Sequence, residues 1–197
     1  QGLLLDVIGD ANDYVGKGLS GATIQLRPPS DAAFPGGENT IIGNTCLYGA
    51  TSGKLYAAGQ AGVRFAVRNS GAEAVVEGCG ANGCEYMTGG RVAILGSIGD
   101  NFGAGMTGGI AYIWDPEKCF EHVANPDAID WYPLVDMERK HIDVFKMMLE
   151  IHVARTGSVR ASELLTEWSR TMNDTLMIVP KEISDRVLGE TDLQKAG

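Results

Sequence analysis

The sequence lacks the features that mark secreted, membrane-spanning or nucleic-acid-binding proteins. No stretch approaches the roughly 20 consecutive apolar residues of a transmembrane helix. Residues 1–6 carry neither a basic segment nor the apolar run of a secretory signal. The net charge is −9, and the lysines and arginines form no stripe that would attract phosphates or an anionic membrane. We therefore expect a cytoplasmic chain with no nucleic-acid or membrane partner.

Side chains that commonly bind metals or act as nucleophiles are also scarce. The four cysteines are too few for a disulfide-stapled fold, and Cys79 and Cys84 form only half of a typical zinc-ligand set, so we expect buried, reduced thiols. All three histidines, His122, His141 and His152, lie beyond residue 121, and no serine occupies a G-x-S-x-G pattern. The sequence predicts no catalytic residue, no metal site and no cofactor site.

Glycine divides the chain into two regions. Of the 27 glycines, 24 lie in residues 1–115, where short apolar or β-branched runs alternate with turn-forming segments. Residues 116–197 contain the other three glycines and read as amphipathic helices. We therefore predict a glycine-rich domain over 1–115 and a helical tail over 116–197, which packs on that domain or on a neighbouring one.

The apolar runs recur at a nearly constant interval. Taking one residue from each run, the intervals are 17, 17, 14, 19, 18 and 18 residues. The segments between runs are too short and polar for the helices of βαβ units, and the spacing is too long for simple hairpins. A mainly β fold, a parallel solenoid with one strand and about 17–18 residues per coil, satisfies the pattern. The chosen residues are Val7, Ile24, Ile41, Leu55, Ala74, Val92 and Ile110.

Glycine has a physical role in such a coil, because repeated corners need positive φ angles or close backbone approach. Asparagine tolerates the same corners next best, and Asn12, Asn44, Asn69, Asn82 and Asn101 all lie between the runs. We expect Gly105→Val to destabilise the fold without changing any ligand affinity. The predicted structural corner glycines are Gly16, Gly18, Gly21, Gly49, Gly53, Gly103, Gly105 and Gly108.

Two G-x-G-x-x-G strings, beginning at Gly16 and Gly103, raise the alternative of a nucleotide-binding enzyme. A dinucleotide site needs a helix to begin at this motif, with its N-terminus facing the pyrophosphate. Strand-like residues follow both strings instead, namely 22–26 and 110–113. We therefore favour solenoid corners over a cofactor site.

Four charged residues stand within the glycine-rich region. Arg64, Arg68, Glu77 and Glu85 could form an active constellation. Arginine and glutamate on a solenoid surface more often serve packing or interfaces. We predict that they make interdomain contacts.

The tail contains signals for three helices and one extended segment. An apolar stripe over 137–155 predicts an amphipathic helix that ends near Gly157. Ser158 can cap a second helix, whose apolar residues recur from 161 to 172. Residues 176–179 suit a strand or a buried extended segment, and Pro180 suits the start of a short helix.

Long strings in both regions resemble the C-terminal domain of glutamate synthase large subunits, and they are far more specific than a lone G-x-G-x-x-G. The resemblance covers nearly the whole chain. The strings are Gly9–Gly21, Gly43–Thr51, Arg64–Gly71, Cys84–Gly90, Asn101–Gly109 and His152–Ala161.

This resemblance implies a right-handed β-helix wedged between a glutaminase domain and a synthase domain of the same large subunit. In that family, ammonia released from glutamine travels internally to the synthase domain. There FMN and an iron–sulfur cluster serve the conversion of 2-oxoglutarate to glutamate. The matched region contains neither active centre, so the resemblance implies a non-catalytic scaffold. A free-standing subunit that assembles with separate glutaminase-like and synthase-like chains is the alternative.

The first apolar run, residues 3–8, has no earlier run to cover it. A solenoid end of this kind exposes an unpaired strand edge and part of its core. The tail follows the last run and more naturally protects the far end or the flank. We therefore expect self-association through the N-terminal edge.

Overall fold

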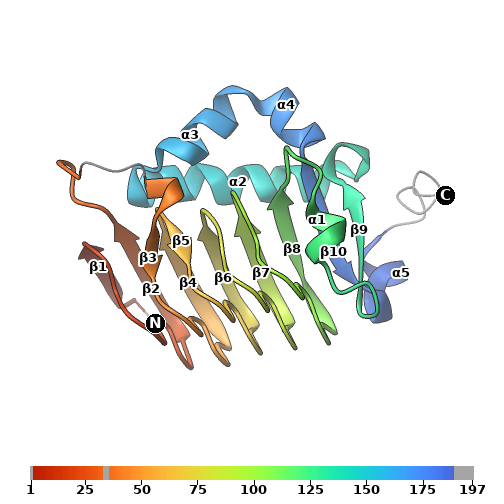
Figure 1. Cartoon of the computed structure of the whole chain (residues 1–197), viewed down its shortest axis with the longest axis horizontal. Coiled ribbons are helices and arrows are strands. Elements are labelled where there is room, and N and C mark those ends of the chain that lie inside the picture. The colour runs from red at the N-terminus through yellow and green to blue at the C-terminus, as the bar shows by residue number, and fades with distance from the viewer. Residues whose placement is uncertain (1, 33–35, 189–197) are drawn as a thin grey trace.

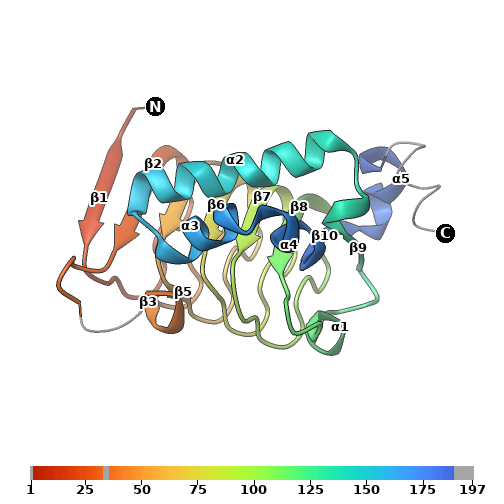
Figure 2. The ribbon, with the colours of Figure 1, turned by 90° about the horizontal axis from the view of Figure 1, so that it is seen from above.

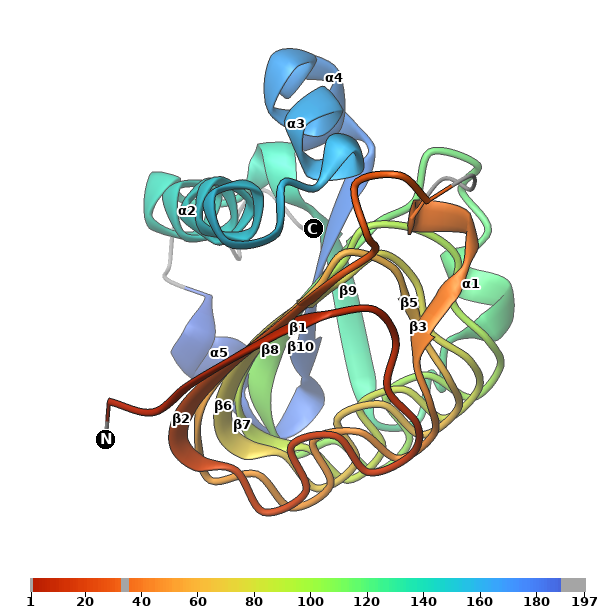
Figure 3. The same ribbon diagram turned by 90° about the vertical axis from the view of Figure 1, so that its left-hand side faces the viewer.

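A computed structural model describes residues 2–32 and 36–188. Its main element is a parallel sheet in which each strand comes from a new turn of the chain, so the predicted β-solenoid is confirmed (Figure 1). Seen from the first strand, the chain turns clockwise as it recedes, which makes the solenoid right-handed (Figure 3). The six parallel strands are β1 (Leu4–Ile8), β2 (Ser20–Arg27), β4 (Ser52–Ala57), β6 (Ser70–Val76), β7 (Thr88–Ile94) and β8 (Gly108–Trp114).

Each coil has two further sides. One is a short side where β3 (Thr40–Ile42) pairs with β5 (Gln60–Ala61) and single bridges continue the stack. The other, which we call the turn face, consists of residues 13–18, 44–49, 63–68, 81–86 and 100–105. The predicted one strand per coil therefore holds for the main sheet, while the short side adds two brief strands.

The observed coil length corrects the predicted spacing. Residues paired along the main sheet follow one another at intervals of 19, 31, 19, 18 and 19, from Leu5 to Ala111. Ile41 marked a separate coil in the sequence pattern, but it lies in β3 on the short side of the coil that begins with β2. The long interval contains an insertion that includes the 3-10 helix η1 (Gly36–Glu38). A short β-branched run has the same sequence pattern whether it forms a strand of the main sheet or a strand of the short side. The sequence therefore could not show that Ile41 belongs to the short side.

The turn face joins consecutive coils by a regular set of backbone hydrogen bonds. Three bonds link each pair of coils, with donor–acceptor distances of 2.8–3.1 Å. In the first pair, the donors Tyr14, Gly18 and Leu47 bond to carbonyl oxygens of the adjacent coil. To direct N–H groups alternately up and down the stack, every second residue adopts a positive φ. Each turn-face segment thus has three left-handed positions.

Glycine fills these left-handed positions only in part. It occupies five of the fifteen, Gly16, Gly18, Gly49, Gly103 and Gly105, and residues with side chains occupy the others. Asn82 and Asn101 adopt φ of 60° and 61° there, as expected of asparagine. The predicted corner glycines Gly21, Gly53 and Gly108 lie instead within the main-sheet strands. Gly21 and Gly53 have positive φ.

Gly108 is needed for space and not for a positive φ. A Cβ at this position would lie 2.1 Å from the carbonyl oxygen of Thr88 in the preceding coil. Gly105 does have a positive φ, 63°, and a Cβ there would meet the ring of Tyr86 at 2.5 Å. The effect of Gly105→Val on stability stays a prediction.

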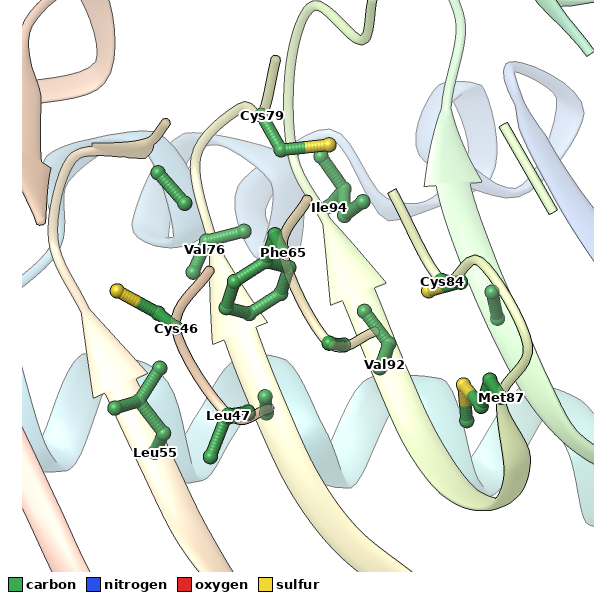
Figure 4. Packing of buried hydrophobic residues seen from close by; sticks show 14 of the residues in the cluster. Cys46, Leu47, Leu55, Phe65, Val76, Cys79, Cys84, Met87, Val92 and Ile94 are labelled. Carbon is green, nitrogen blue, oxygen red and sulfur yellow. The ribbon is translucent and has the colours of Figure 1, made fainter. Parts of the chain in front are cut away.

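Beyond β1, the main sheet is buried on both faces because its strands alternate between two apolar clusters. Leu55, Val76, Val92 and Ile94 point into the solenoid, where they pack among stacked side chains such as Phe65 (Figure 4). The residues between them point outward into a second cluster, shared with the tail. That cluster includes Tyr56, Val75, Ala93, Tyr112, Phe145, Met148 and Leu164.

The tail confirms two predicted helices and corrects a third. The long helix α2 (Arg139–Thr156) ends at Gly157, which has φ of 69°, and lies along the main sheet (Figure 2). The next helix divides at Glu167 into α3 (Val159–Thr166) and α4 (Trp168–Asn173), whereas the apolar pattern predicted one helix. The short helix after Pro180 is present as η3 (Lys181–Ile183) and α5 (Ser184–Val187).

The tail is less helical than expected, since it also extends the main sheet. After α1 (Phe120–Val123), strand β9 (Ile129–Pro133) precedes η2 (Leu134–Asp136), and β10 (Thr175–Pro180) follows α4. Strand β10 pairs antiparallel with β8 and β9, so it covers the last coil. The sequence pattern predicted no strand at residues 129–133, where β9 lies.

The opposite end of the sheet is open. Strand β1 pairs only with β2 in the part of the chain that is described. Leu3, Leu4 and Leu5 are 60%, 47% and 45% exposed, in agreement with the uncovered edge that the sequence predicted. Within the described ranges, no helix is both long and apolar enough to cross a membrane.

The two kinds of glycine predict different mutational costs. Gly49→Ala adds a Cβ in open space at φ of 63°, so only backbone strain of about 1 kcal/mol should result. Gly108→Ala forces β7 and β8 apart at Thr88, and overpacking of this kind costs about 3 kcal/mol. Urea unfolding midpoints of the two variants test this difference. Equal midpoints would show that the coils can separate without penalty at Gly108.

Candidate functional site

The most concentrated group of buried polar side chains lies between the solenoid and the tail. Glu77 directly follows β6, and its side chain is 2% exposed. The carboxylate reaches the turn between α2 and α3, where its Oε1 accepts a hydrogen bond from the Ser158 hydroxyl. The same oxygen lies 3.4 Å from Nε2 of His152, whose side chain is fully buried. One carboxylate of the solenoid thus binds two residues of the tail.

Local hydrogen bonds explain why the tail presents these two side chains together. The Ser158 hydroxyl accepts from the backbone N–H of Ala161 at 3.0 Å and so caps α3, as the sequence predicted. Thr156 donates its hydroxyl to the carbonyl of His152 at 2.7 Å and accepts from the N–H of Ser158 at 3.3 Å. Among the described residues, His152 Nδ1 has no hydrogen-bond partner. The α2–α3 turn is therefore built around the carboxylate.

Arg160 and the insertion complete this junction. The Arg160 guanidinium donates to the carbonyl of Leu95 at 3.0 Å and lies 5.3 Å from the centre of the Trp114 ring. A Cβ at Gly37 would come within 3.1 Å of both Arg160 Nη2 and Glu77 Oε2. The glycine therefore lets the insertion close over the two charged groups.

The junction contains serine, histidine and glutamate, yet its connections are not those of a nucleophilic triad. In such a triad the histidine lies between the nucleophile and the acid, and it accepts the hydroxyl proton. Here the Ser158 hydroxyl bonds to the carboxylate of Glu77, and all three side chains are removed from solvent. The geometry suits attachment of the tail to the solenoid. His152 therefore has a structural role.

The four charged residues predicted from the sequence do not form one constellation. Arg64, Arg68 and Glu85 lie on the turn face, where an Arg64 guanidinium nitrogen is 3.7 Å from Glu85 Oε2. Arg68 is exposed. Glu77 is instead buried within the chain, so its carboxylate is committed to the tail. Sequence reasoning overlooked this pairing, although His152–Ala161 was among the recognised strings.

The G-x-G-x-x-G strings lead into strands, as predicted. Gly21 lies in β2 and Gly108 in β8, and no helix begins at either string. A pyrophosphate would therefore meet no helix N-terminus there.

Three of the four cysteines are buried, as expected. Burial raises the pKa of Cys46 to about 11 and that of Cys79 to about 12, and it raises the pKa of Cys84 well above its usual value. Cys119 is exposed, which corrects the prediction for that residue, and partial burial together with Asp115 raises its pKa. Over the described ranges, no three His, Cys, Asp or Glu side chains gather as a metal site.

A cavity of about 630 Å³ lies where α3 and α4 meet the loops after β7 and β8. Ile98, Trp114, Phe120 and Leu164 form its apolar lining, and Arg160 enters from the junction. Cys119 also lines it, but its raised pKa disfavours the reactive thiolate.

Comparison with known proteins places the chain in a family. The family model described as the GXGXG motif matches residues 1–181, and the chain belongs to that family. Its relatives include the glutamate synthase [NADPH] large chain of Azospirillum brasilense, which is 53% identical over all 197 residues. Glutamate synthase [NADH] of Schizosaccharomyces pombe is 49% identical over 92% of this chain. Ferredoxin-dependent glutamate synthase of Pyropia yezoensis is 46% identical over 91%.

These relatives are much longer than the chain. It spans 13% of the Azospirillum protein, 8% of the Schizosaccharomyces protein and 12% of the Pyropia protein. The similarity therefore concerns one segment of a large chain.

Removal of the Glu77 carboxylate should loosen the tail. Glu77→Ala leaves the Ser158 hydroxyl and His152 without their shared acceptor, and each buried polar group left unsatisfied costs about 1–3 kcal/mol. Glu73→Ala is the matched control, because Glu73 makes only a partly exposed contact with Lys54 at 3.9 Å. Urea unfolding should give a large loss for Glu77→Ala and a change within about 0.5 kcal/mol for the control. Similar losses for both variants would contradict the assigned role of Glu77.

Proposed function

We propose that this chain is the non-catalytic scaffold domain of a glutamate synthase, the enzyme that forms L-glutamate from L-glutamine and 2-oxoglutarate. The observation that carries the proposal is similarity over the whole chain to a small segment of glutamate synthase large chains. Because the relatives contain the segment within one long chain, the similarity favours a domain over a free-standing subunit.

The architecture supports a bracing role. Parallel strands lie about 4.8 Å apart, so six coils form a rod roughly 25 Å long. Burial of the main sheet on both faces ties the tail to this rod, and the Glu77 junction adds a polar connection. A body of this kind holds neighbouring glutaminase and synthase domains at a fixed separation while ammonia passes between them. In this proposal, FMN and the iron–sulfur cluster belong to the synthase domain.

The proposal predicts that the 197-residue chain alone forms no glutamate. Purified chain should be colourless, and it should show no turnover with glutamine, 2-oxoglutarate and a reductant, with or without added FMN. The natural gene product, assayed in parallel, establishes that the conditions support the reaction. Chain-dependent turnover or a stoichiometric flavin spectrum would falsify the scaffold assignment.

The open β1 edge also predicts how the isolated chain behaves. Unpaired strand groups and the exposed leucines 3–5 should promote self-association, and lysine on an edge strand opposes it. Sedimentation equilibrium should show concentration-dependent oligomers that Leu3→Lys with Leu4→Lys abolishes. Val159→Lys is the control, because Val159 is 70% exposed on α3. A monomer at high concentration would show that this edge does not mediate association.

A further inference from the structure

The tail leaves the turn face bare except at its last segment, where Phe102 donates to the carbonyl of Val123 and accepts from the N–H of Asn125. Seen along the solenoid, α2, α3 and α4 lie outside the main sheet, and the turn face lies on the opposite side of the coils (Figure 3). The short side is covered in part by η1, which packs on the Glu77 junction. The rest of the turn face is therefore available to a neighbour, whereas the tail covers the main sheet and η1 covers part of the short side (Figure 3).

At one of the three left-handed positions of each segment, two residues keep side chains where the other coils have glycine. The third left-handed position of each segment is occupied by Gly18, Gly49, Arg68, Tyr86 and Gly105 in successive coils. Arg68 and Tyr86 both adopt φ of 54°. The left-handed conformation costs a residue with a Cβ roughly 1–2 kcal/mol, and glycine avoids this cost. The same backbone is therefore built with glycine in three coils and with large side chains in two.

Core packing does not explain these two side chains. Arg68 is exposed and forms no ion pair with any described residue. Tyr86 is 52% exposed, and its ring lies over the backbone of Gly105. Backbone strain at exposed residues that contribute little to the core is a feature of functional surfaces.

Similar side chains surround them. Tyr14 is left-handed with φ of 64° and 54% exposed, and the Lys17 ammonium lies 5.3 Å from its ring centre. Arg64 is left-handed with φ of 62°, and its side chain is 48% exposed beside Glu85. We call Tyr14, Lys17, Arg64, Arg68 and Tyr86 the turn-face patch.

The composition of the patch indicates the chemistry of its partner. Tyrosine and arginine dominate the energetics of many protein interfaces, because they bury large areas and still form polar contacts. The whole chain has a net charge of −9, but on the turn face the carboxylates of Asp13, Glu85 and the exposed Asp100 are matched by the three cations of the patch. Glu85 pairs with one of them, and the Asp13 carboxylate at the margin accepts from the N–H of Asn44 at 2.7 Å. Lys17 and Arg68 remain available to carboxylates.

We infer that the turn-face patch docks on an acidic surface of another domain of the same large chain. Arg68 supplies an ion pair to that surface, and Tyr86 becomes buried against it. This inference rests on the proposed scaffold function and names the side of the scaffold that makes the contact.

Photo-cross-linking in the natural gene product tests the contact directly. With p-benzoylphenylalanine in place of Tyr86, irradiation should join position 86 to a segment of the same chain outside residues 1–197, near Asp or Glu residues. The same protein unfolded in urea is the control and should lose this product. Adducts confined to residues 1–197, or cross-linked dimers in place of the intrachain product, would overturn the inference.

Substitutions at Arg68 separate docking from folding. In the protein that carries p-benzoylphenylalanine at position 86, Arg68→Glu should lower the yield of the intrachain cross-link at least fivefold. Arg139→Glu makes the same charge change at an exposed site on α2 and should leave that yield unchanged. Arg68→Gly should also lower the yield, although it relieves the left-handed strain and should not lower the unfolding midpoint. A yield that is unchanged in both Arg68 variants would overturn the inference.

A glutamate-formation assay on the parent gene product separates failure of the proposed docking surface from failure of the proposed glutamate synthase function. Activity without the intrachain cross-link would overturn the docking surface and leave the scaffold function standing. The cross-link without glutamate formation would overturn the glutamate synthase assignment and leave the docking surface standing.

Discussion

Close stacking of successive coils is the constraint on which the rest of the structure depends. Each coil must bond to the next on its main sheet, its short side and its turn face at one common spacing. On the turn face this requires left-handed residues at alternate positions, and at Gly108 it leaves no room for a Cβ. The glycine content therefore follows from coil spacing and implies no phosphate-binding loop.

The same stacking produces a sheet with two apolar faces, and the outer face needs a cover. Helices α2 and α3 provide it, with Tyr112 and Phe145 in contact at a ring separation of 5.3 Å. Apolar packing alone does not fix the orientation of the helices on the sheet. The buried Glu77 carboxylate does so, because its hydrogen bonds fix the turn between α2 and α3. Apolar burial supplies the attachment, and the polar junction sets its register.

A rigid solenoid can carry binding residues at positions that its own folding would assign to glycine. Arg68 and Tyr86 occupy such positions, and their strain is borne by a backbone that hydrogen bonds hold on both sides. The turn-face patch can therefore be changed with little disturbance of the core. This separation suits a domain whose proposed task is to hold other domains in place.

The sequence by itself determined the parallel solenoid, the helix that ends at Gly157 and the Ser158 cap. These features follow from local signals, namely periodicity, glycine placement and capping residues. The sequence also indicated the open first coil. Only the tertiary structure decided that Ile41 lies on the short side, that residues 129–133 extend the sheet, and that Glu77 meets His152. These outcomes depend on contacts between distant segments, 75 residues apart for Glu77 and His152. A local pattern cannot specify such a contact, because burial and pairing arise only when the coils stack and the tail folds back over them.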